Sequence, residues 1–221
     1  MARSGGPAFA RLRGVRITKF EHACVRIEHD GNVVVLDPGV LTRREAVEGA
    51  TAVLITHEHA DHLSVDHLAA VDAPVFTIDA VAKAIGSPEV LERTTVVAPG
   101  DTFDVGLPVR AVGELHAVIH PEFQRFFNSG YVVYGDESLF HPGDAFTPPG
   151  EDVDVLCTPV CAPWAKISEV LDYARANAAP RNLAIHDMVY SEFGLGIVDP
   201  RMEAFVGEGN VYKRLKPGED L

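Results

Sequence analysis

Residues 54–64 read LITHEHADHLS and crowd three histidines and an aspartate into one turn. His57 and His59 are two positions apart, so on an extended segment their imidazoles project to the same side and suit one metal ion. Asp61 continues that alternation, and the adjacent His62 can turn toward a second ion. Imidazoles and carboxylates are ligands that zinc, manganese and iron accept. The spacing therefore predicts a metal site at this turn.

A strand is predicted directly before this motif. Residues 51–56 (TAVLIT) are a short, continuous apolar run, which is typical of a strand buried on both faces. Residues 64–71 then indicate a short helix capped by Ser64. Ligand sites in α/β sheets lie just beyond the carboxyl ends of strands. The histidine motif is therefore expected on a strand-to-helix loop at the edge of a sheet.

The rest of the chain combines strand-like and helical segments. Alternating apolar residues predict β-meanders over residues 14–37 and 102–141, and strand–helix alternation follows each of them. Residues 165–178 form the clearest amphipathic helix, and residues 199–206 predict a helix with Pro200 in its first turn. This order predicts an α/β fold of four layers, αββα, in which two mixed β-sheets pack face to face between outer helices.

Composition limits the classes of partner. The net charge of −13 repels nucleic acid backbones and anionic membrane surfaces. No apolar stretch approaches the roughly 20 residues of a membrane-spanning helix, and the first residues lack the apolar core of a signal peptide. We expect a cytoplasmic protein that binds neither nucleic acid nor membrane and is able to form a homo-oligomer. Residues 1–221 are expected to form one domain, with residues 1–13 as a flexible N-terminal segment.

The motif THEHADH resembles the defining motif of the metallo-β-lactamase superfamily. Matching positions for the rest of the family signature lie upstream and downstream, each at or near the end of a strand-like segment. They are Asp37 in VVVLDPG, His116 in VGELHAV, Asp144 in FHPGDAF and His186 in NLAIHDM. The resemblance covers residues 16–198, nearly the whole chain, and it implies the four-layer fold of that family.

The resemblance also implies the ligands of two divalent metal ions, Zn²⁺ foremost and Mn²⁺ or Fe²⁺ as alternatives. The first ion would take His57, His59 and His116, the second would take Asp61, His62 and His186, and Asp144 would bridge the two. Asp37 is expected to support these ligands without binding metal. The flavin-partnered di-iron branch of the superfamily has glutamate at the position of His59, so that branch is disfavoured.

The implied activity is hydrolysis by a metal-bound hydroxide, with Asp61 and Asp144 as catalytic residues and a small ester, lactone or phosphodiester as substrate. Residues 20–39 resemble the branch that includes L-ascorbate-6-phosphate lactonase and uncharacterised hydrolases, although Glu21 replaces a usual glycine. A substrate that is anionic or carries a carbonyl would suit the positive charge of two ions. Two alternatives remain open: a nuclease or RNA-processing enzyme of the same fold, and a non-catalytic metal-binding protein.

Substrate contacts are predicted only from position. His120 and Arg125 follow His116 along the chain, and Trp164 and Lys166 lie where a strand leads into a helix. Lysine or arginine there would pair with a phosphate. Trp164 and the phenylalanines of the same regions could equally be packing residues. Two further histidines, His22 and His141, are expected to be structural rather than ligands.

Overall fold

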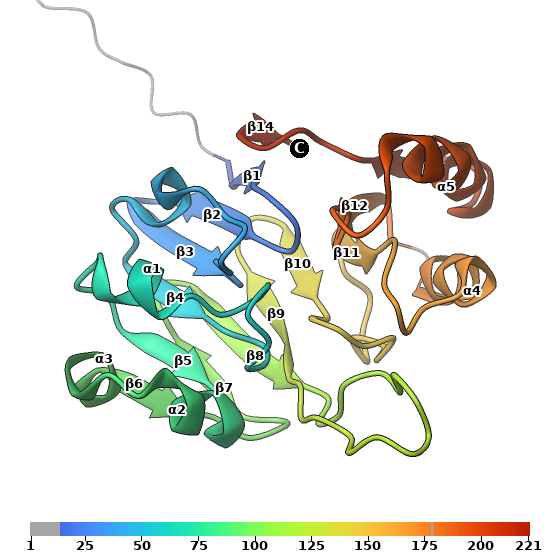
Figure 1. Ribbon diagram of the computed structural model, residues 1–221. Coiled ribbons are helices and arrows are strands. Elements are labelled where there is room, and N and C mark those ends of the chain that lie inside the picture. Colours follow the sequence, from blue (N-terminus) through green and yellow to red (C-terminus); the bar gives the residue numbers. More distant parts are fainter. Residues whose placement is uncertain (1–13, 178) are drawn as a thin grey trace, which may run out of the picture.

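The computed structural model describes residues 14–177 and 179–221, so the N-terminal segment expected at residues 1–13 lies outside the described residues. The chain forms two seven-stranded sheets that pack face to face (Figure 1). In spatial order, the first sheet contains β14 (Glu219–Asp220), β1 (Arg16–Lys19), β2 (Val25–His29), β3 (Asn32–Leu36), β4 (Ala52–Leu54), β5 (Val75–Thr77) and β6 (Thr94–Val96). The second contains β13 (Val211–Lys213), β12 (Arg181–Ile185), β11 (Val155–Pro159), β10 (Ser138–His141), β9 (Gly130–Tyr134), β8 (Pro108–Val112) and β7 (Thr102–Asp104).

Both sheets are mixed in the same way. Strands β14, β1, β2 and β3 pair antiparallel, whereas β3 to β6 pair parallel. In the second sheet β7 to β10 pair antiparallel and β10 to β13 pair parallel. Parallel neighbours need a crossover, and helices supply most of these connections. Each half of the chain therefore runs as a meander followed by strand–helix units, as the sequence predicts.

Helices cover the two outer faces. The helical segments are η1 (Arg44–Val47), α1 (Val65–Ala69), α2 (Asp79–Ile85), α3 (Pro88–Glu92), α4 (Ile167–Asn177) and α5 (Glu192–Phe205). In Figure 1, α1 to α3 lie outside the first sheet at the left, and α4 and α5 lie outside the second sheet at the right. The predicted four-layer αββα fold is confirmed.

The main core lies between the two sheets. Inward-facing residues such as Leu36 and Leu54 from the first sheet meet Tyr131, Val155 and Leu183 from the second. Neighbouring residues on the same strands face the helices instead, because side chains alternate along a strand. Val53 and Ile55, for example, pack against α1 and α2. Strand β4 is thus buried on both faces, which explains its unbroken apolar sequence.

One predicted helix boundary is wrong. The helix expected over residues 199–206 begins instead at Glu192, with the Ser191 hydroxyl accepting a hydrogen bond from the Gly194 amide. Pro200 lies inside α5 and removes one hydrogen bond of the helix. The helix continues because a buried stripe that includes Leu195, Val198 and Met202 packs against α4 and the second sheet. Packing therefore outweighs the local cost of the proline.

Within residues 14–177 and 179–221, no helix has both the length and the apolar character that crossing a bilayer requires.

Candidate metal centre

Strand direction brings the predicted site residues to one edge of the two sheets. Strands β1 and β3 are both antiparallel to β2, so they run in the same direction, and β4 is parallel to β3. His22, Asp37 and the loop 56–62 therefore leave the first sheet at a common edge. In the second sheet β8, β10 and β12 also share one direction. His116, Asp144 and His186 follow these strands.

One group of possible ligands comes from three loops. It consists of His57, His59, His116 and Asp144, whose ligand atoms lie within 4.8 Å of one another. The nearest pair is Nε2 of His57 and Nδ1 of His59, which are 3.0 Å apart. Nε2 of His116 lies 3.3 Å from Oδ2 of Asp144. These atoms are close enough for all four side chains to hold one ion.

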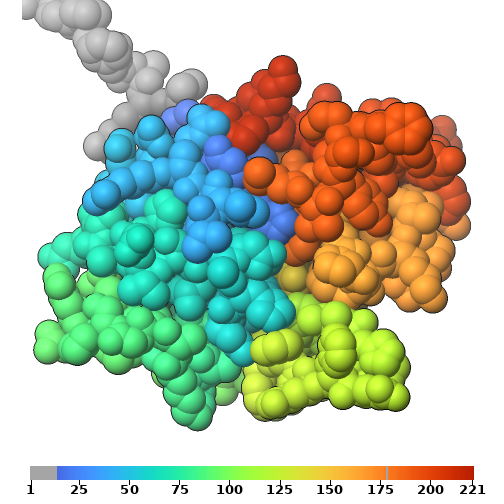
Figure 2. All heavy atoms as spheres, in the orientation of Figure 1, coloured from blue at the N-terminus to red at the C-terminus, as the bar shows by residue number. Residues whose placement is uncertain are grey.

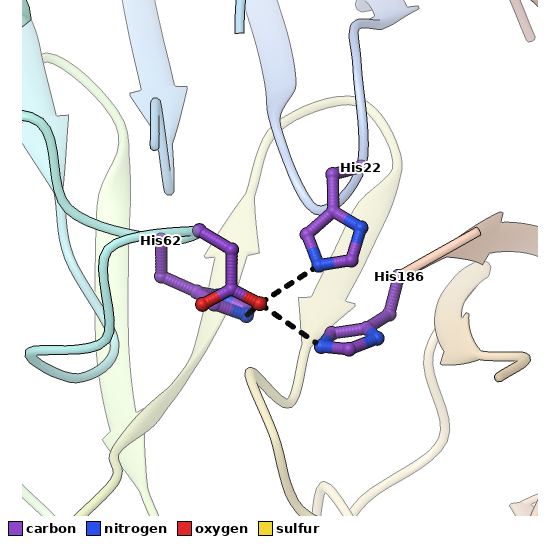
Figure 3. Close-up of side chains that lie close together, drawn as sticks. His22, His62 and His186 are labelled. Atoms are coloured by element: carbon purple, nitrogen blue, oxygen red, sulfur yellow. Dashed lines mark hydrogen bonds and ion pairs between the residues drawn. The ribbon is translucent and has the colours of Figure 1, made fainter. Parts of the chain in front are cut away.

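A second group lies beside the first. It consists of His22, Asp61, His62 and His186, again with ligand atoms within 4.8 Å of one another. Figure 3 shows the imidazoles of His22, His62 and His186 converging from three segments of the chain. Oδ2 of Asp61 lies 3.0 Å from Nε2 of His22 and 3.4 Å from Nε2 of His186. The two groups thus contain all seven residues that the family resemblance implies as ligands. The second group also contains His22.

Asp144 lies between the two groups. Its Oδ1 is 3.0 Å from Nε2 of His62, and its Oδ2 is 3.2 Å from Nε2 of His186, both of the second group. The same Oδ2 is 3.8 Å from Nε2 of His57, which belongs to the first group. The carboxylate is buried, with only 3% of the side chain exposed. One buried carboxylate therefore faces histidines of both groups.

Hydrogen bonds that Nδ1 donates orient two of the histidines around Asp144. His116 and His186 donate from Nδ1 to the carbonyl oxygens of Ala117 and Cys161, over 2.7 and 2.6 Å. A carbonyl oxygen accepts only, so Nδ1 carries a proton in both rings and Nε2, the nitrogen that would bind a cation, faces the centre. Such bonds are typical of histidines that bind metal. The orientation of these rings is therefore set by the backbone.

Buried atoms without a hydrogen-bond partner collect at the centre. They include Nε2 of His62, His116 and His186 and Oδ1 of Asp144. An isolated buried polar atom costs free energy, and such atoms in a folded protein call for a partner. Four of them point into one space, and all are nitrogen or oxygen ligands of the kind that divalent cations accept.

Asp37 supports the centre from behind. Its carboxylate is fully buried and accepts hydrogen bonds from the Thr56 amide, the Thr56 hydroxyl and Nδ1 of His62, at 2.8, 2.7 and 2.7 Å. The Thr56 hydroxyl also lies 3.0 Å from Nδ1 of His57. A hydroxyl that donates to Asp37 is free to accept from His57. Asp37 thus orients one histidine of each group without facing the centre.

Charge coupling shifts the pKa values in the centre. Burial lowers the pKa of His57 well below its ordinary value, and the neighbouring His62 adds to this effect. Burial alone would also lower the pKa of His186, but the carboxylates of Asp144 and Asp61 outweigh it and raise that pKa to about 9. Burial opposes ionisation of Asp144, yet His62 and His186 hold its pKa well below the usual range. Asp144 is therefore a carboxylate at physiological pH.

The predicted substrate contacts have different surroundings. The indole of Trp164 donates from Nε1 to Oδ2 of Asp144 over 3.1 Å and packs near the rings of His116 and His186. Arg125 instead donates to the backbone oxygen of His116 over 2.8 Å. His120 and Lys166 are exposed, and their contacts are local: Nδ1 of His120 accepts from the Glu122 amide, and the Lys166 amide donates to the Glu169 side chain. Of these four side chains, Trp164 contacts the side chain of a candidate ligand, whereas Arg125 contacts only the backbone of one.

His22 is the candidate that sequence reasoning missed. It was expected to be structural, but it contacts Asp61, and its ring lies 4.0 Å from that of His186. Its position just after β1 was the available signal, because the other site residues also follow strands. His141, by contrast, has backbone partners on both ring nitrogens, Ala23 O and Gly143 N, as expected of a structural histidine.

Known proteins share both the sequence pattern and the fold. Residues 16–186 match the family described as "Beta-lactamase superfamily domain". Protein Rv0786c of Mycobacterium tuberculosis is 40% identical over 199 residues, which cover 85% of this chain and 91% of the relative. A protein named UPF0173 metal-dependent hydrolase, from Methylobacterium nodulans, is 41% identical over 59 residues, which cover 22% of this chain and 25% of the relative.

A solved structure has the same architecture. Igni18, a metallo hydrolase from the archaeon Ignicoccus hospitalis, superposes with a TM-score of 0.72 at 18% identity, over 94% of this chain and 97% of its own. At that identity the likeness concerns the fold. The family match, by contrast, spans most of the chain, and the superfamily resemblance expected from the sequence is confirmed. The protein belongs to the beta-lactamase superfamily.

Proposed function

We propose that the protein is a metal-dependent hydrolase that binds two divalent ions and cleaves a small ester, lactone or phosphodiester. Family membership and the names of its relatives support the hydrolase class. The observation that carries the two-ion proposal is Asp144, a buried carboxylate that faces histidines of both candidate groups. A side chain in that position is suited to bridge two cations.

The proposed ligands are those that the family resemblance implies. His57, His59 and His116 would hold one ion, Asp61, His62 and His186 would hold the other, and Asp144 would bind both. His22 is not among the proposed ligands. The Met188 amide donates to its Nδ1 over 3.4 Å, so the ring proton is on Nε2 and is donated to Asp61. Nitrogen and oxygen ligands without thiolates favour zinc, with manganese and iron as alternatives.

Bound divalent ions would supply positive charge that makes a nucleophile from water available near neutral pH. The chain's own residues supply the surroundings. Asp61 is one-third exposed and is the most open of the carboxylates at the centre, so it is placed to orient an incoming water. His22 holds that carboxylate in place by its hydrogen bond. The indole of Trp164 orients Asp144 and covers part of the centre.

The proposed substrate class follows from charge. Two divalent cations carry four positive charges, of which Asp61 and Asp144 would neutralise two. A net positive centre in a chain of charge −13 attracts a small molecule that is anionic or carries a carbonyl. All three cysteines are buried and unpaired, which supports a reducing compartment such as the cytoplasm.

Metal analysis and one substitution test the proposal together. Protein purified without chelator should contain close to two transition-metal equivalents per chain, and one or none would contradict the two-ion centre. Asp144→Ala should remove the shared ligand and abolish hydrolysis of a generic lactone or phosphodiester that the wild type accepts. Asp154→Ala, at an exposed carboxylate outside the centre, is the control and should leave metal content unchanged. Normal turnover by Asp144→Ala would show that its proposed role is wrong.

A further inference from the structure

Exposed apolar side chains gather on three segments that adjoin the candidate centre. The segments follow Asp37, flank His116 and follow His186. Most of the large apolar side chains that are exposed among the described residues lie on them. We call six of these side chains the apolar rim: Val40, Val118, Phe123, Phe127, Met188 and Phe193. Two of them, Val118 and Phe123, line the same cavity. Scattered single apolar residues are normal on a protein surface, whereas several on the loops that carry one site favour a binding surface there.

Hydrogen bonds attach each segment to the centre. The amide of Val40 donates to Ala60 O over 2.8 Å, within the histidine loop. The Ala117 amide donates to Asp144 O over 2.8 Å, and the Met188 amide donates to Nδ1 of His22. The rim is thus built on the same loops that position the proposed ligands. In Figure 2 the lime part of the chain, which flanks His116, lies next to the cyan part that carries the histidine loop, and the orange part is visible on the same face.

The opening of the centre lies among these segments. Asp61 is 33% exposed and His59 is half-buried, whereas His57 and Asp144 are buried. Solvent therefore reaches the centre past His59 and Asp61. The ring of Phe126 lies 4.4 Å from that of His59 and lines a cavity of about 310 Å³ together with Val118, Ile119 and Phe123. An apolar cavity thus begins next to the exposed ligand.

We propose that the substrate is amphipathic, with its hydrolysable polar group at the metal centre and an acyl or alkyl chain on the apolar rim. This inference rests on the proposed function and specifies its substrate class. A small molecule is favoured over a second copy of the chain, because a copy seated on the rim would close the opening. An anionic membrane surface is disfavoured by the charge of −13.

A homologous series of esters from acetyl to octanoyl tests the rim by activity. For metal-loaded wild type, kcat/KM should rise about threefold to fourfold per methylene until the rim is filled, because each buried methylene contributes a similar increment. Phe123→Ser should lower kcat/KM at least tenfold for the octanoyl ester, a much larger loss than for the acetyl ester. Phe123 is 64% exposed, so its replacement should not disturb folding. Leu91→Ser, at an exposed position on α3, is the matched control and should change neither value.

Binding provides a second measurement that does not need turnover. Trp164 is the one tryptophan of the chain and lies beside Asp144, so its fluorescence reports ligands at the centre. Alkylphosphonates of two to eight carbons should bind metal-loaded wild type with Kd falling about threefold to fourfold per methylene. Phe123→Ser and Phe193→Ser should flatten that dependence, and Leu91→Ser should preserve it.

Different outcomes would exclude the amphipathic substrate and the hydrolase activity itself. A wild type that turns over acetyl and octanoyl esters equally, with phosphonate affinity independent of length, would overturn the amphipathic substrate and leave the hydrolase intact. Loss of metal binding and of turnover on every ester would overturn the proposed function itself. A dimer that dissociates in Phe193→Ser, or sedimentation with phosphatidylcholine vesicles that both rim variants abolish, would assign the rim to another partner and also overturn the inference.

Discussion

Nδ1 of His62 lies 2.7 Å from Oδ2 of Asp37, and both side chains are fully buried although 25 residues separate them in the chain. Both oxygens of Asp37 also accept from Thr56, one from its amide and the other from its hydroxyl. The carboxylate therefore has only donors around it. This arrangement aims Nε2 of His62 at Asp144 and explains why a buried aspartate occurs so close to the centre without facing it.

Asp37→Asn should weaken metal binding by roughly 10- to 100-fold. The new amide NH₂ would face a donor whichever way it turns, because both oxygens of Asp37 accept hydrogen bonds. Competition with a chromophoric chelator measures the affinity. Asp66→Asn, at an exposed position on α1, is the control and should bind like wild type. Equal affinity for the two variants would contradict the role of Asp37.

His186→Asn and His22→Asn should separate a ligand from a hydrogen-bond donor. Both histidines have positive φ, 56° in each case, and asparagine tolerates this conformation well. His186→Asn should lose about one metal equivalent, since Nε2 of His186 faces Asp144. His22→Asn should keep both ions but lower kcat about tenfold, because Asp61 loses its donor. Elemental analysis with steady-state kinetics distinguishes them, and loss of an ion from His22→Asn would make His22 a ligand.

Gly39→Ala should distort the loop that carries the histidine motif. A Cβ at this position would lie 2.0 Å from the backbone oxygen of Asp61, which cannot move without moving its neighbour His62. We expect a loss of about 3 kcal/mol in the free energy of unfolding, together with weaker metal binding. Gly196→Ala is the contrasting variant, because open space surrounds that position in α5. It should stabilise the protein by about 0.5–1 kcal/mol in urea denaturation. Equal stabilities would contradict the close packing at Gly39.

Removal of metal by chelation should lower the melting temperature. Each ion that binds only the folded state at 100 times its Kd adds about 2.7 kcal/mol of stability. For a chain of this size that corresponds to about 5–10 °C in Tm. Differential scanning calorimetry before and after adding Zn²⁺ measures the shift. Asp144→Ala should show a much smaller response, and an unchanged Tm in wild type would argue against ions at the buried unpaired atoms.

Much of the fold was predictable because local patterns carried it. The apolar run of β4, the alternating meanders and the Ser64 cap each depend on neighbouring residues, and each occurs where the sequence indicated it. The short strands β13 and β14 and the start of α5 were not predicted. The positions of β13 and β14 depend on pairing with β12 and β1, which are distant along the chain. The start of α5 depends on packing that outweighs the local effect of Pro200.

The sequence by itself determined which kinds of side chain could bind metal and that each follows a strand. Only the tertiary structure decided which of them meet. His22 reaches the same edge of the first sheet as Asp37 because β1 is antiparallel to β2 and therefore shares the direction of β3. There the His186 amide donates to His22 O over 3.0 Å. The pairing of Asp37 with His62 and the contact of Trp164 with Asp144 likewise join residues that are distant along the chain. Such contacts follow from strand order and packing, which no local spacing of residues records.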